Sequence, residues 1–293
     1  MTPTQVQLLS LASVLGVFAF LEWRLGRFSP PQATREDHRL DVAVIVMFLT
    51  VTAAVASTAN LLGSIWMPEW RGALADWPWW GMLLTLIIGD DLTQYGWHRL
   101  SHSSVLWPLH RAHHSAPYMS VRVVYRNNAL YYALMPGLWI MGLLVYLGFG
   151  WVTVGYTLVK ITVIVGAHSA WRWDEALYRK PALRPLMWVL ERLISTPATH
   201  HAHHALTEAD GVGHYSGNFG NLFFLWDIIF GTAVITRRYP PAVGLQDDLD
   251  FGPERWEAQL FYPFVRSSRA QTVLGRLPGL PPATTKVDHP FAK

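Results

Sequence analysis

The stretch HRLSHSSVLWPLHRAHH, residues 98–114, decides how this chain is organised. It places five histidines directly after an apolar run that is long enough to cross a bilayer. A second cluster, HHAHH, follows at residues 200–204. The spacings are H-x3-H and then, twice, H-x2-H-H, and side chains three or four residues apart share one face of a helix. Each group is therefore expected to direct its imidazole rings at one point.

Histidines at these spacings predict a metal site, because neutral imidazole binds Fe, Zn, Cu and Ni. The eight that fit the spacings are His98, His102, His110, His113, His114, His200, His203 and His204. Eight exceed the four ligands of a structural zinc site, so they indicate two ions, or one ion with a large outer shell. A single histidine at a membrane edge is usually a solvated surface residue, and a His-rich metal store is usually a low-complexity tail. Neither alternative suits clusters embedded in varied sequence.

The composition predicts a polytopic membrane protein with a polar cap. Of the 293 residues, 51% are hydrophobic and only 15% are charged, whereas a soluble protein is about 25% charged. The 15 Trp residues suit membrane–water interfaces. A net charge of +3 is too small to indicate nucleic acid as a partner, and the absence of Cys excludes disulfides and thiolate ligands. The expected fold class is all-α.

Apolar runs predict about four to five membrane helices. They are residues 6–23, 40–62, 77–97, 129–149 and 151–167. The first is interpreted as an uncleaved membrane helix, because no basic region precedes it and no small-residue cleavage site follows. The last two, joined tightly around Gly148 and Gly150, form a hairpin that either spans or dips.

The positive-inside rule orients these runs. The Arg-rich loop 24–39 is assigned to the cytoplasm and the loop 63–76 to the far side. The third run then delivers His98 to the cytoplasmic face, and the hairpin delivers His168 to the same face. All the histidine groups are thus expected on one side of the membrane, and a wrong number of spans would have separated them.

Four segments together resemble the fatty acid hydroxylase / sterol desaturase superfamily of integral membrane di-iron oxygenases. They are DLTQYGWHRLSH (91–102), LHRAHHS (109–115), STPATHHAHH (195–204) and NFGNLFFLWDIIFGT (218–232). The resemblance covers about residues 85–232, and bacterial lipid hydroxylases and the alkylglycerol monooxygenase branch look closer than the acyl-CoA desaturases. It implies a small bundle of membrane helices and a cytosolic helical cap that holds two metals. The expected organisation is 1–80, N-terminal transmembrane helices; 81–235, catalytic region; and 236–293, C-terminal cytosolic tail.

The superfamily's metal ligands carry over to the eight histidines named above. His168, in GAHSAW, fits the place of a further ligand, and Arg172 stands where some members have a second histidine. His201 is either the tenth ligand or a group behind the ligands. His214 either lines the site or lies in a surface loop, while His38 and His289 are interpreted as bystanders.

Asp91 precedes His98 by seven residues, about two helical turns, which places both on one helix face. A carboxylate at membrane depth is usually functional or paired. Ligating histidines commonly donate their second N–H to a carboxylate. Asp91 is therefore expected to support His98, with Asp90 as the weaker choice.

Two further polar residues follow the last histidine cluster. Asp227 is expected either to support that cluster or to form a salt bridge with Arg111 or Arg99. Asn218, by resemblance, orients a ligand through its amide. Aromatic residues near the clusters are candidates for the walls of a substrate site, with simple packing as the alternative: Trp97, Trp107, Tyr118, Trp171 and Trp173.

The expected function is a lipid monooxygenase that uses O2 and two Fe ions to hydroxylate or desaturate an alkyl chain or sterol-like lipid. No haem-binding or flavin-binding segment is visible, so a separate reductase, ferredoxin or cytochrome is expected to supply electrons. The general affinity order predicts that Zn can replace Fe in a recombinant preparation. The resemblance to bacterial enzymes places the protein in a bacterial inner membrane, with the metal site on the cytoplasmic side.

Two alternatives from other classes remain open at this point. A zinc-dependent membrane hydrolase would require a general-base Glu beside its ligands, as in H-E-x-x-H, and no such motif occurs. A metal-handling membrane protein would require ionisable residues inside the spans, whereas these histidines lie at span ends. Carboxylate-bridged di-iron proteins need Glu-x-x-His repeats, which the chain lacks. The basic end of the chain is expected to contact anionic lipid or to form a mobile tail: Arg266, Arg269, Arg276, Lys286 and Lys293.

Overall fold

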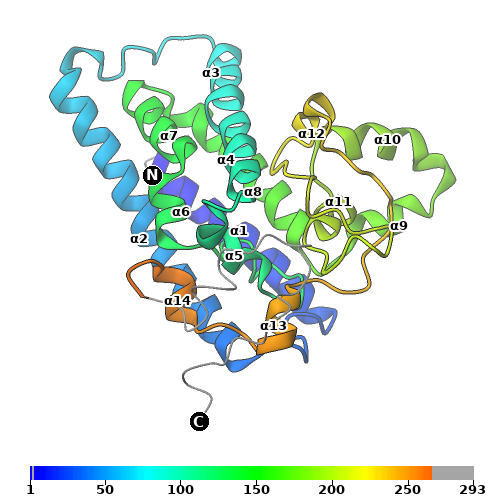
Figure 1. Cartoon of the computed structure of the whole chain (residues 1–293). Coiled ribbons are helices and arrows are strands. Elements are labelled where there is room, and N and C mark those ends of the chain that lie inside the picture. The colour runs from blue at the N-terminus through cyan, green and yellow to red at the C-terminus, as the bar shows by residue number, and fades with distance from the viewer. Residues whose placement is uncertain (2, 266–293) are drawn as a thin grey trace.

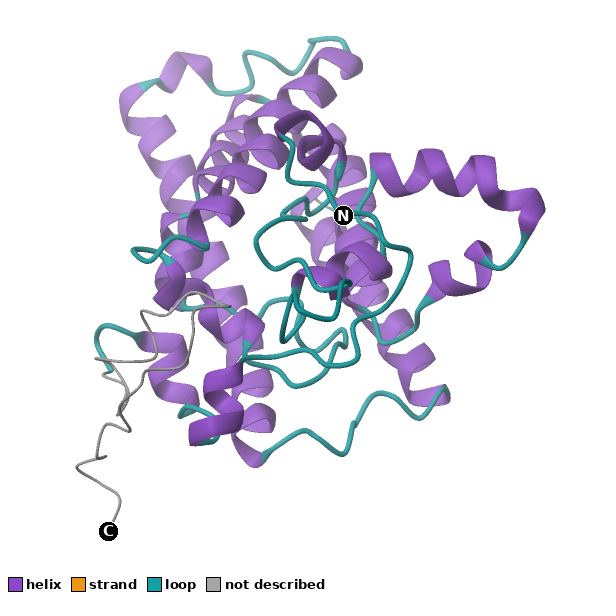
Figure 2. Cartoon of the chain, turned by 45° about the vertical axis from the view of Figure 1, so that its right-hand side comes forward, coloured by secondary structure: helices purple, strands orange, loops and turns teal. Residues whose placement is uncertain are grey.

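The computed structural model describes residue 1 and residues 3–265, so the basic end of the chain lies outside the described residues. Within them the regular structure is helical and there is no strand, as Figure 2 shows, which confirms the all-α prediction. The longer helices, eight residues or more, are α1 (Pro3–Arg24), α2 (Arg35–Trp66), α3 (Trp79–Leu86), α4 (Thr93–Ser101), α5 (Trp107–His114), α7 (Pro136–Leu147), α8 (Gly150–His168) and α10 (Arg184–Leu193). The short ones are α6 (Ala129–Leu134), α9 (Trp173–Tyr178), α11 (Pro197–His203), α12 (Leu225–Phe230), α13 (Gln246–Phe251) and α14 (Trp256–Phe261).

Three of these helices are long and apolar enough to cross a membrane. They are Gln5–Arg24 within α1, the whole of α2, and α8. α2 begins at a capping box, in which Thr34 and Asp37 each accept from the other's backbone N–H. α1 packs along α8, and α2 packs along α7.

The apolar run expected at 77–97 forms one rod built from three segments. α3 passes into a π-helical turn, Ile87–Leu92, and then into α4. The residues at the junctions, Ile87 and Thr93, keep right-handed helical dihedral angles, so the rod does not break. Its length from Trp79 to Ser101 is about 35 Å at 1.5 Å per residue.

The run expected at 129–149 is bent rather than straight. Met135 adopts an extended conformation between α6 and α7, and Pro136 begins α7. A proline has no N–H to continue the preceding helix and is suited to the first helical turn. α7 alone is therefore a shorter apolar helix of 12 residues.

α10 and α12 lie together on the right of Figure 1, away from α2 and α7. Both expose large apolar side chains: Leu186, Trp188, Val189 and Leu193 on α10, and Leu225, Ile228, Ile229 and Phe230 on α12. Exposed apolar side chains also cover the long helices, among them Leu8, Val17, Phe20, Val42 and Leu61. Exposed apolar side chains on several helices are what contact with lipid requires.

Candidate metal centre

Four helical segments present the histidines at one end of the bundle. α4 carries His98, and His102 caps its C-terminus. α5, which starts with Pro108 in its first turn, carries three histidines, and α8 ends at His168. α11, a helix of seven residues, carries the last cluster. Two local features fix its start, a capping box on Thr196 and Pro197 in the first turn.

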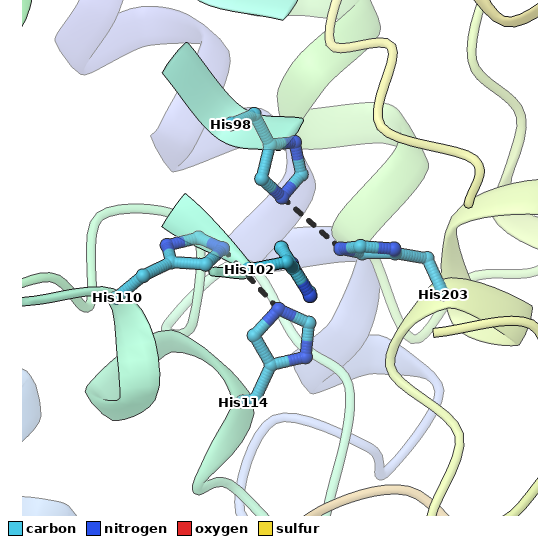
Figure 3. Close-up of side chains that lie close together, drawn as sticks. All are labelled: His98, His102, His110, His114 and His203. Atoms are coloured by element: carbon cyan, nitrogen blue, oxygen red, sulfur yellow. Dashed lines mark hydrogen bonds between the residues drawn. The ribbon is translucent and has the colours of Figure 1, made fainter. Parts of the chain in front are cut away.

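The histidines converge in two groups, and these do not follow the sequence clusters as expected: His113 separates from His110 and His114, and His203 separates from His200 and His204. The first contains five: His98, His102, His110, His114 and His203, which Figure 3 shows turned toward a common centre. The second contains four: His113, His168, His200 and His204. Within each group the nitrogen atoms lie within 4.8 Å of one another. The groups are adjacent, because His114 of the first stacks on His204 of the second with 4.3 Å between ring centroids.

The distances between Nε2 atoms fit coordination to a shared ion. They are 3.0 Å for His98–His203, 3.2 Å for His110–His114, 3.2 Å for His113–His168, 2.9 Å for His168–His200 and 3.2 Å for His200–His204. Two nitrogens bound at about 2.1 Å to one ion lie about 3.0 Å apart at a right angle and about 3.4 Å apart at the tetrahedral angle. His102 contributes a buried Nε2 that has no hydrogen-bond partner among the described residues.

Carbonyl oxygens hold the outer nitrogen of several rings. The Nδ1 of His98 donates to the Phe219 carbonyl, and that of His203 donates to the Gly217 carbonyl, both at 2.7 Å. The Nδ1 of His168 donates to the Ile164 carbonyl of its own helix at 2.8 Å. A carbonyl only accepts, so these contacts keep the proton on Nδ1 and leave the Nε2 lone pair pointing inward.

Burial keeps the rings in the form that binds metal. It lowers the pKa of His110, His113, His200 and His204 well below the usual range of imidazole, and neighbouring histidines lower it further. All four are therefore neutral at pH 7, as ligation requires. Neither group contains a carboxylate among the described residues. Buried, neutral nitrogen donors that converge on two points fit two metal ions, and nitrogen ligands suit Fe and Zn alike.

His201 lies outside both groups. Its Nε2 meets the Ser169 carbonyl at 3.1 Å, and its ring packs edge-on against Tyr239. Arg172, which stands where some members of the superfamily have a second histidine, stacks over the same Tyr239 ring at 4.1 Å. The structure thus brings together nine of the ten histidines expected to bind metal.

The histidines interpreted as marginal lie outside the two groups as well. His214 lies 3.7 Å from the Glu208 carboxylate in the loop after α11. The Nδ1 of His38 accepts from Arg122 near the start of α2. His289 lies outside the described residues.

Asp91 does not support His98 directly, because the Phe219 carbonyl already takes the His98 Nδ1–H. The Asp91 carboxylate accepts from the Trp226 indole at 2.7 Å and from the Phe223 N–H at 3.2 Å. Asp91 lies in the π-helical turn and its carboxylate is used by the loop before α12 and by Trp226 at the start of α12. Asp90 instead pairs with Lys160 and accepts from the Tyr156 hydroxyl at 2.7 Å.

Asp227 and Asn218 hold the loop whose carbonyls contact the ligands. Asp227 accepts from the backbone N–H groups of Phe219 and Gly220, at 2.8 and 2.6 Å. It forms neither of the salt bridges expected as alternatives. Arg111 pairs with Asp248, and Arg99 lies 3.5 Å from the Tyr95 hydroxyl. Asn218 stands between the two carbonyl groups that His203 and His98 use. Its amide donates to the Thr199 and Val234 carbonyls at 3.0 Å, and its φ of 57° is left-handed, a conformation that Asn tolerates better than most residues.

Three polar residues that sequence reasoning did not single out also position the centre. Asn127 accepts from the His110 Nδ1 at 2.7 Å. Asp174 accepts from the Ala198 N–H at the start of α11. Glu22, fully buried, accepts from Ser120, Val121, Ser169 and Ala170. The signal for Glu22 was visible: it is the one ionisable residue in the apolar run 6–23.

Of the aromatic residues considered as walls, Trp107 reaches the ligands. Its ring lies 5.5 Å from His102 and 5.4 Å from His114. The Tyr118 hydroxyl donates to Asp41 instead, and the Trp173 indole donates to the Gly166 carbonyl. Phe219, which was not considered, covers the five-histidine group at 5.1–5.7 Å from the rings of His98, His102 and His203.

Comparison with known proteins agrees with this arrangement. Residues 83–232, half of the chain, match the family model described as fatty acid hydroxylase. The chain is similar to the alkylglycerol monooxygenase of Xenopus tropicalis, with 27% identity over 54% of this chain and 31% of that protein. It is also similar to that of Danio rerio, with 26% identity over 53% and 30%. The matches thus span about a third of the length of these curated relatives, and no solved structure matches the chain.

Proposed function

The chain belongs to the fatty acid hydroxylase family, and from that membership together with its nine-histidine centre we propose that it is a membrane-bound lipid monooxygenase that uses O2 and two iron ions. The observation that carries the proposal is the pair of adjacent, buried groups of neutral imidazoles. The relatives support an oxygenase that acts on a lipid, because both are named as alkylglycerol monooxygenases. The reaction is hydroxylation or desaturation of an alkyl chain, with electrons supplied by a separate protein.

The five-histidine group would hold one ion and the four-histidine group the other. When bound, the two ions supply the activation of O2 that removal of hydrogen from an unactivated carbon needs. The protein's own residues fix the rings: the Phe219 and Gly217 carbonyls and the Asn127 amide each hold one Nδ1–H. The Phe219 ring covers the histidines on one side and excludes water there.

A zinc-dependent hydrolase receives less support from this geometry. Such an enzyme needs a general base within hydrogen-bond reach of the metal-bound water. In the described part of the chain, neither group contains a carboxylate. Asp91 and Asp227, the nearest candidates by sequence, are occupied by backbone N–H groups, the Trp226 indole and the Thr232 hydroxyl.

Metal analysis and lipid mass spectrometry test the proposal together. The purified protein should contain iron, and cells that lack it should lose a lipid that carries one additional oxygen or lacks two hydrogens. Isotopically heavy O2 should label the product of a hydroxylation. His110→Ala and His203→Ala should abolish this product while the protein still inserts into the membrane. A protein that holds no iron and leaves the lipid profile unchanged would contradict the proposal.

A further inference from the structure

An apolar cavity opens between α3 and α8, on the outer surface of the bundle. Its volume is about 490 Å³, within the range of sites for small molecules. The rod contributes Trp79 and Leu83 from α3 and Ile87 from the π-helical turn, and α8 contributes Trp151, Gly155 and Val159. Each set is spaced four residues apart, so each forms one stripe along its helix. Trp79, Trp151 and Val159 are exposed, so the cavity is open to the region that lipid would occupy.

One wall of this cavity is part of the loop that covers the histidines. Leu222 and Phe223 close it on one side. They belong to the same loop as Phe219, whose ring covers the five-histidine group. Asp91 holds that part of the loop by accepting from the Phe223 N–H and, at 3.4 Å, from the Leu222 N–H. One short loop therefore forms both a wall of the cavity and a cover of the metal centre.

The cavity is apolar because its one polar side chain is already used. Tyr156 lines it, but the Tyr156 hydroxyl donates to Asp90, which also pairs with Lys160. Apart from the indole N–H groups of Trp79 and Trp151, the remaining side chains offer a polar headgroup no partner, and burying polar groups without partners is costly. Its occupant must then be a hydrocarbon chain.

The position of the cavity along the helices gives the occupant a direction. Val159 precedes His168 by nine residues, which is a rise of about 14 Å, and Ile87 precedes His98 by eleven, which is about 16 Å. Both residues lie on the side of the histidines that faces the start of α3 and α8. An alkyl chain whose far end occupies the cavity therefore has that end distant from the histidines. Its other end, which carries the polar group, lies close to them.

Building on the proposed function, we propose that this cavity holds the distal part of the alkyl chain of a lipid substrate, whose polar end lies at the histidine end of the bundle. Oxidation then falls near the polar end of the chain. The cavity favours long chains, because a short chain that starts at the histidine end does not reach it. The substrate class is a lipid with at least one long, unbranched alkyl chain.

Gly155 provides a test that leaves the protein packing intact. A Cβ at Gly155 meets no atom within 4 Å, so Gly155→Leu projects into the cavity. Gly16 on α1 also meets nothing within 4 Å and lies outside the cavity, so Gly16→Leu is the matched control. Leucine is a better helix former than glycine, so neither variant should lose helical structure. Val159→Trp fills the cavity from a second position.

The experiment uses the full-length protein in nanodiscs and a single-chain glycerol ether lipid with a photoreactive diazirine at the chain terminus. In the wild type, the label should attach to α3 and α8. Gly155→Leu and Val159→Trp should reduce this labelling by about 10-fold or more, as loss of a few methylene contacts does in an apolar pocket. Gly16→Leu should label as the wild type does. Equal labelling in Gly155→Leu and the wild type, or a label found on other helices, would overturn the proposal.

A second readout separates this proposal from the proposed function. With iron and an electron donor present, Gly155→Leu should lose turnover of hexadecyl chains by about 10-fold relative to octyl chains, while Gly16→Leu keeps the wild-type ratio. The oxygen should be found within the first carbons next to the polar group. Labelling in the cavity without any oxidised product would support the cavity and contradict the oxygenase. Oxidation near the far end of the chain would contradict the orientation.

Discussion

At the residue scale, each histidine has two ring nitrogens, and one of them, Nε2, points into the centre. The contact made by the other, Nδ1, decides how the ring is oriented. The Nδ1 atoms of His98, His110 and His203 each donate to a fixed oxygen. Such contacts set the rotation of the ring and make the ligating nitrogen more basic. His200 and His201 are neighbours in one helix, yet only His200 turns its Nε2 toward other histidines, namely His168 and His204.

That pair provides the first prediction. His200→Ala should weaken metal binding by more than about 100-fold, because the variant leaves only three histidines in the four-histidine group. This loss exceeds the one expected when a residue behind a metal ligand is removed. His201→Ala should stay within about 10-fold of the wild type, because its ring contacts a carbonyl and a tyrosine. Chelator competition followed by elemental analysis measures both. Similar losses in the two variants would refute the assignment of His201 outside the centre.

The two carboxylates behind the loop give a graded prediction. Asp227→Asn should lower metal retention by about 10–100-fold, because an amide has one acceptor oxygen for the Phe219 and Gly220 N–H groups, and Phe219 holds His98. Asp91→Asn should lower it less, because Asp91 holds Leu222 and Phe223, farther along the loop. The two are compared by the rate of metal loss to a chelator. A larger effect in Asp91→Asn would restore the original expectation that Asp91 supports His98 itself.

At the scale of elements, α1 contributes more than a membrane anchor. Its Glu22 carboxylate accepts from Ser120 and Val121, which follow α5, and from Ser169 and Ala170, which follow His168. The segments after two ligand-bearing helices are thereby tied to one side chain. The helix that precedes the family match thus positions part of the centre.

Glu22→Gln should destabilise the protein by about 1–3 kcal/mol, since a glutamine presents an N–H2 group to donors that the carboxylate satisfied. Metal retention should fall in parallel, because the turn after His168 loses its support. Thermal unfolding in detergent measures the first effect and elemental analysis the second. Glu69→Gln, an exposed position in the loop after α2, is the control and should unfold as the wild type does. If Glu22→Gln matches that control, the buried carboxylate has no positioning role.

Periodicity and spacing predict elements well where the signal is local. The all-α fold followed from the apolar runs, and helical spacing in H-x2-H-H was enough to expect clustered histidines. The expectation that each cluster aims at one point was wrong, because His113 joins His168, His200 and His204, while His203 joins the five-histidine group. The π-helical turn at Ile87–Leu92 left no such signal, because the side chains of a π turn do not differ in type from those of an α-helix. The role of Asp91 was wrong because a seven-residue spacing reports a shared helix face and not the partner that the carboxylate meets, which here is Phe223 and Trp226. The roles of Asn127 and Gly217 depend on contacts across 17 and 14 residues, which no helical period reports.

At the scale of the whole molecule, the convergence of four helical segments follows from chain direction. The rod α3–α4 and α8 both run toward the same end, so His98 and His168 arrive together. α11 follows α9 and α10 without a further long apolar helix, and it brings His200 and His203 to that end. The apolar surface on α10 and α12 then suits residence at the membrane surface rather than in water.

The sidedness of this arrangement gives the last prediction, and the lack of any cysteine makes it clean to test. Ala73 is exposed in the loop between α2 and α3, and Ala209 is exposed in the loop after α11. The positive-inside rule assigns the first to the far side and the second to the cytoplasm. Ala73→Cys should therefore react with an impermeant maleimide in intact cells, and Ala209→Cys should react only after permeabilisation. Labelling of Ala209→Cys in intact cells would contradict the expected orientation, because it would place the histidine end on the far side and require electrons to be delivered there.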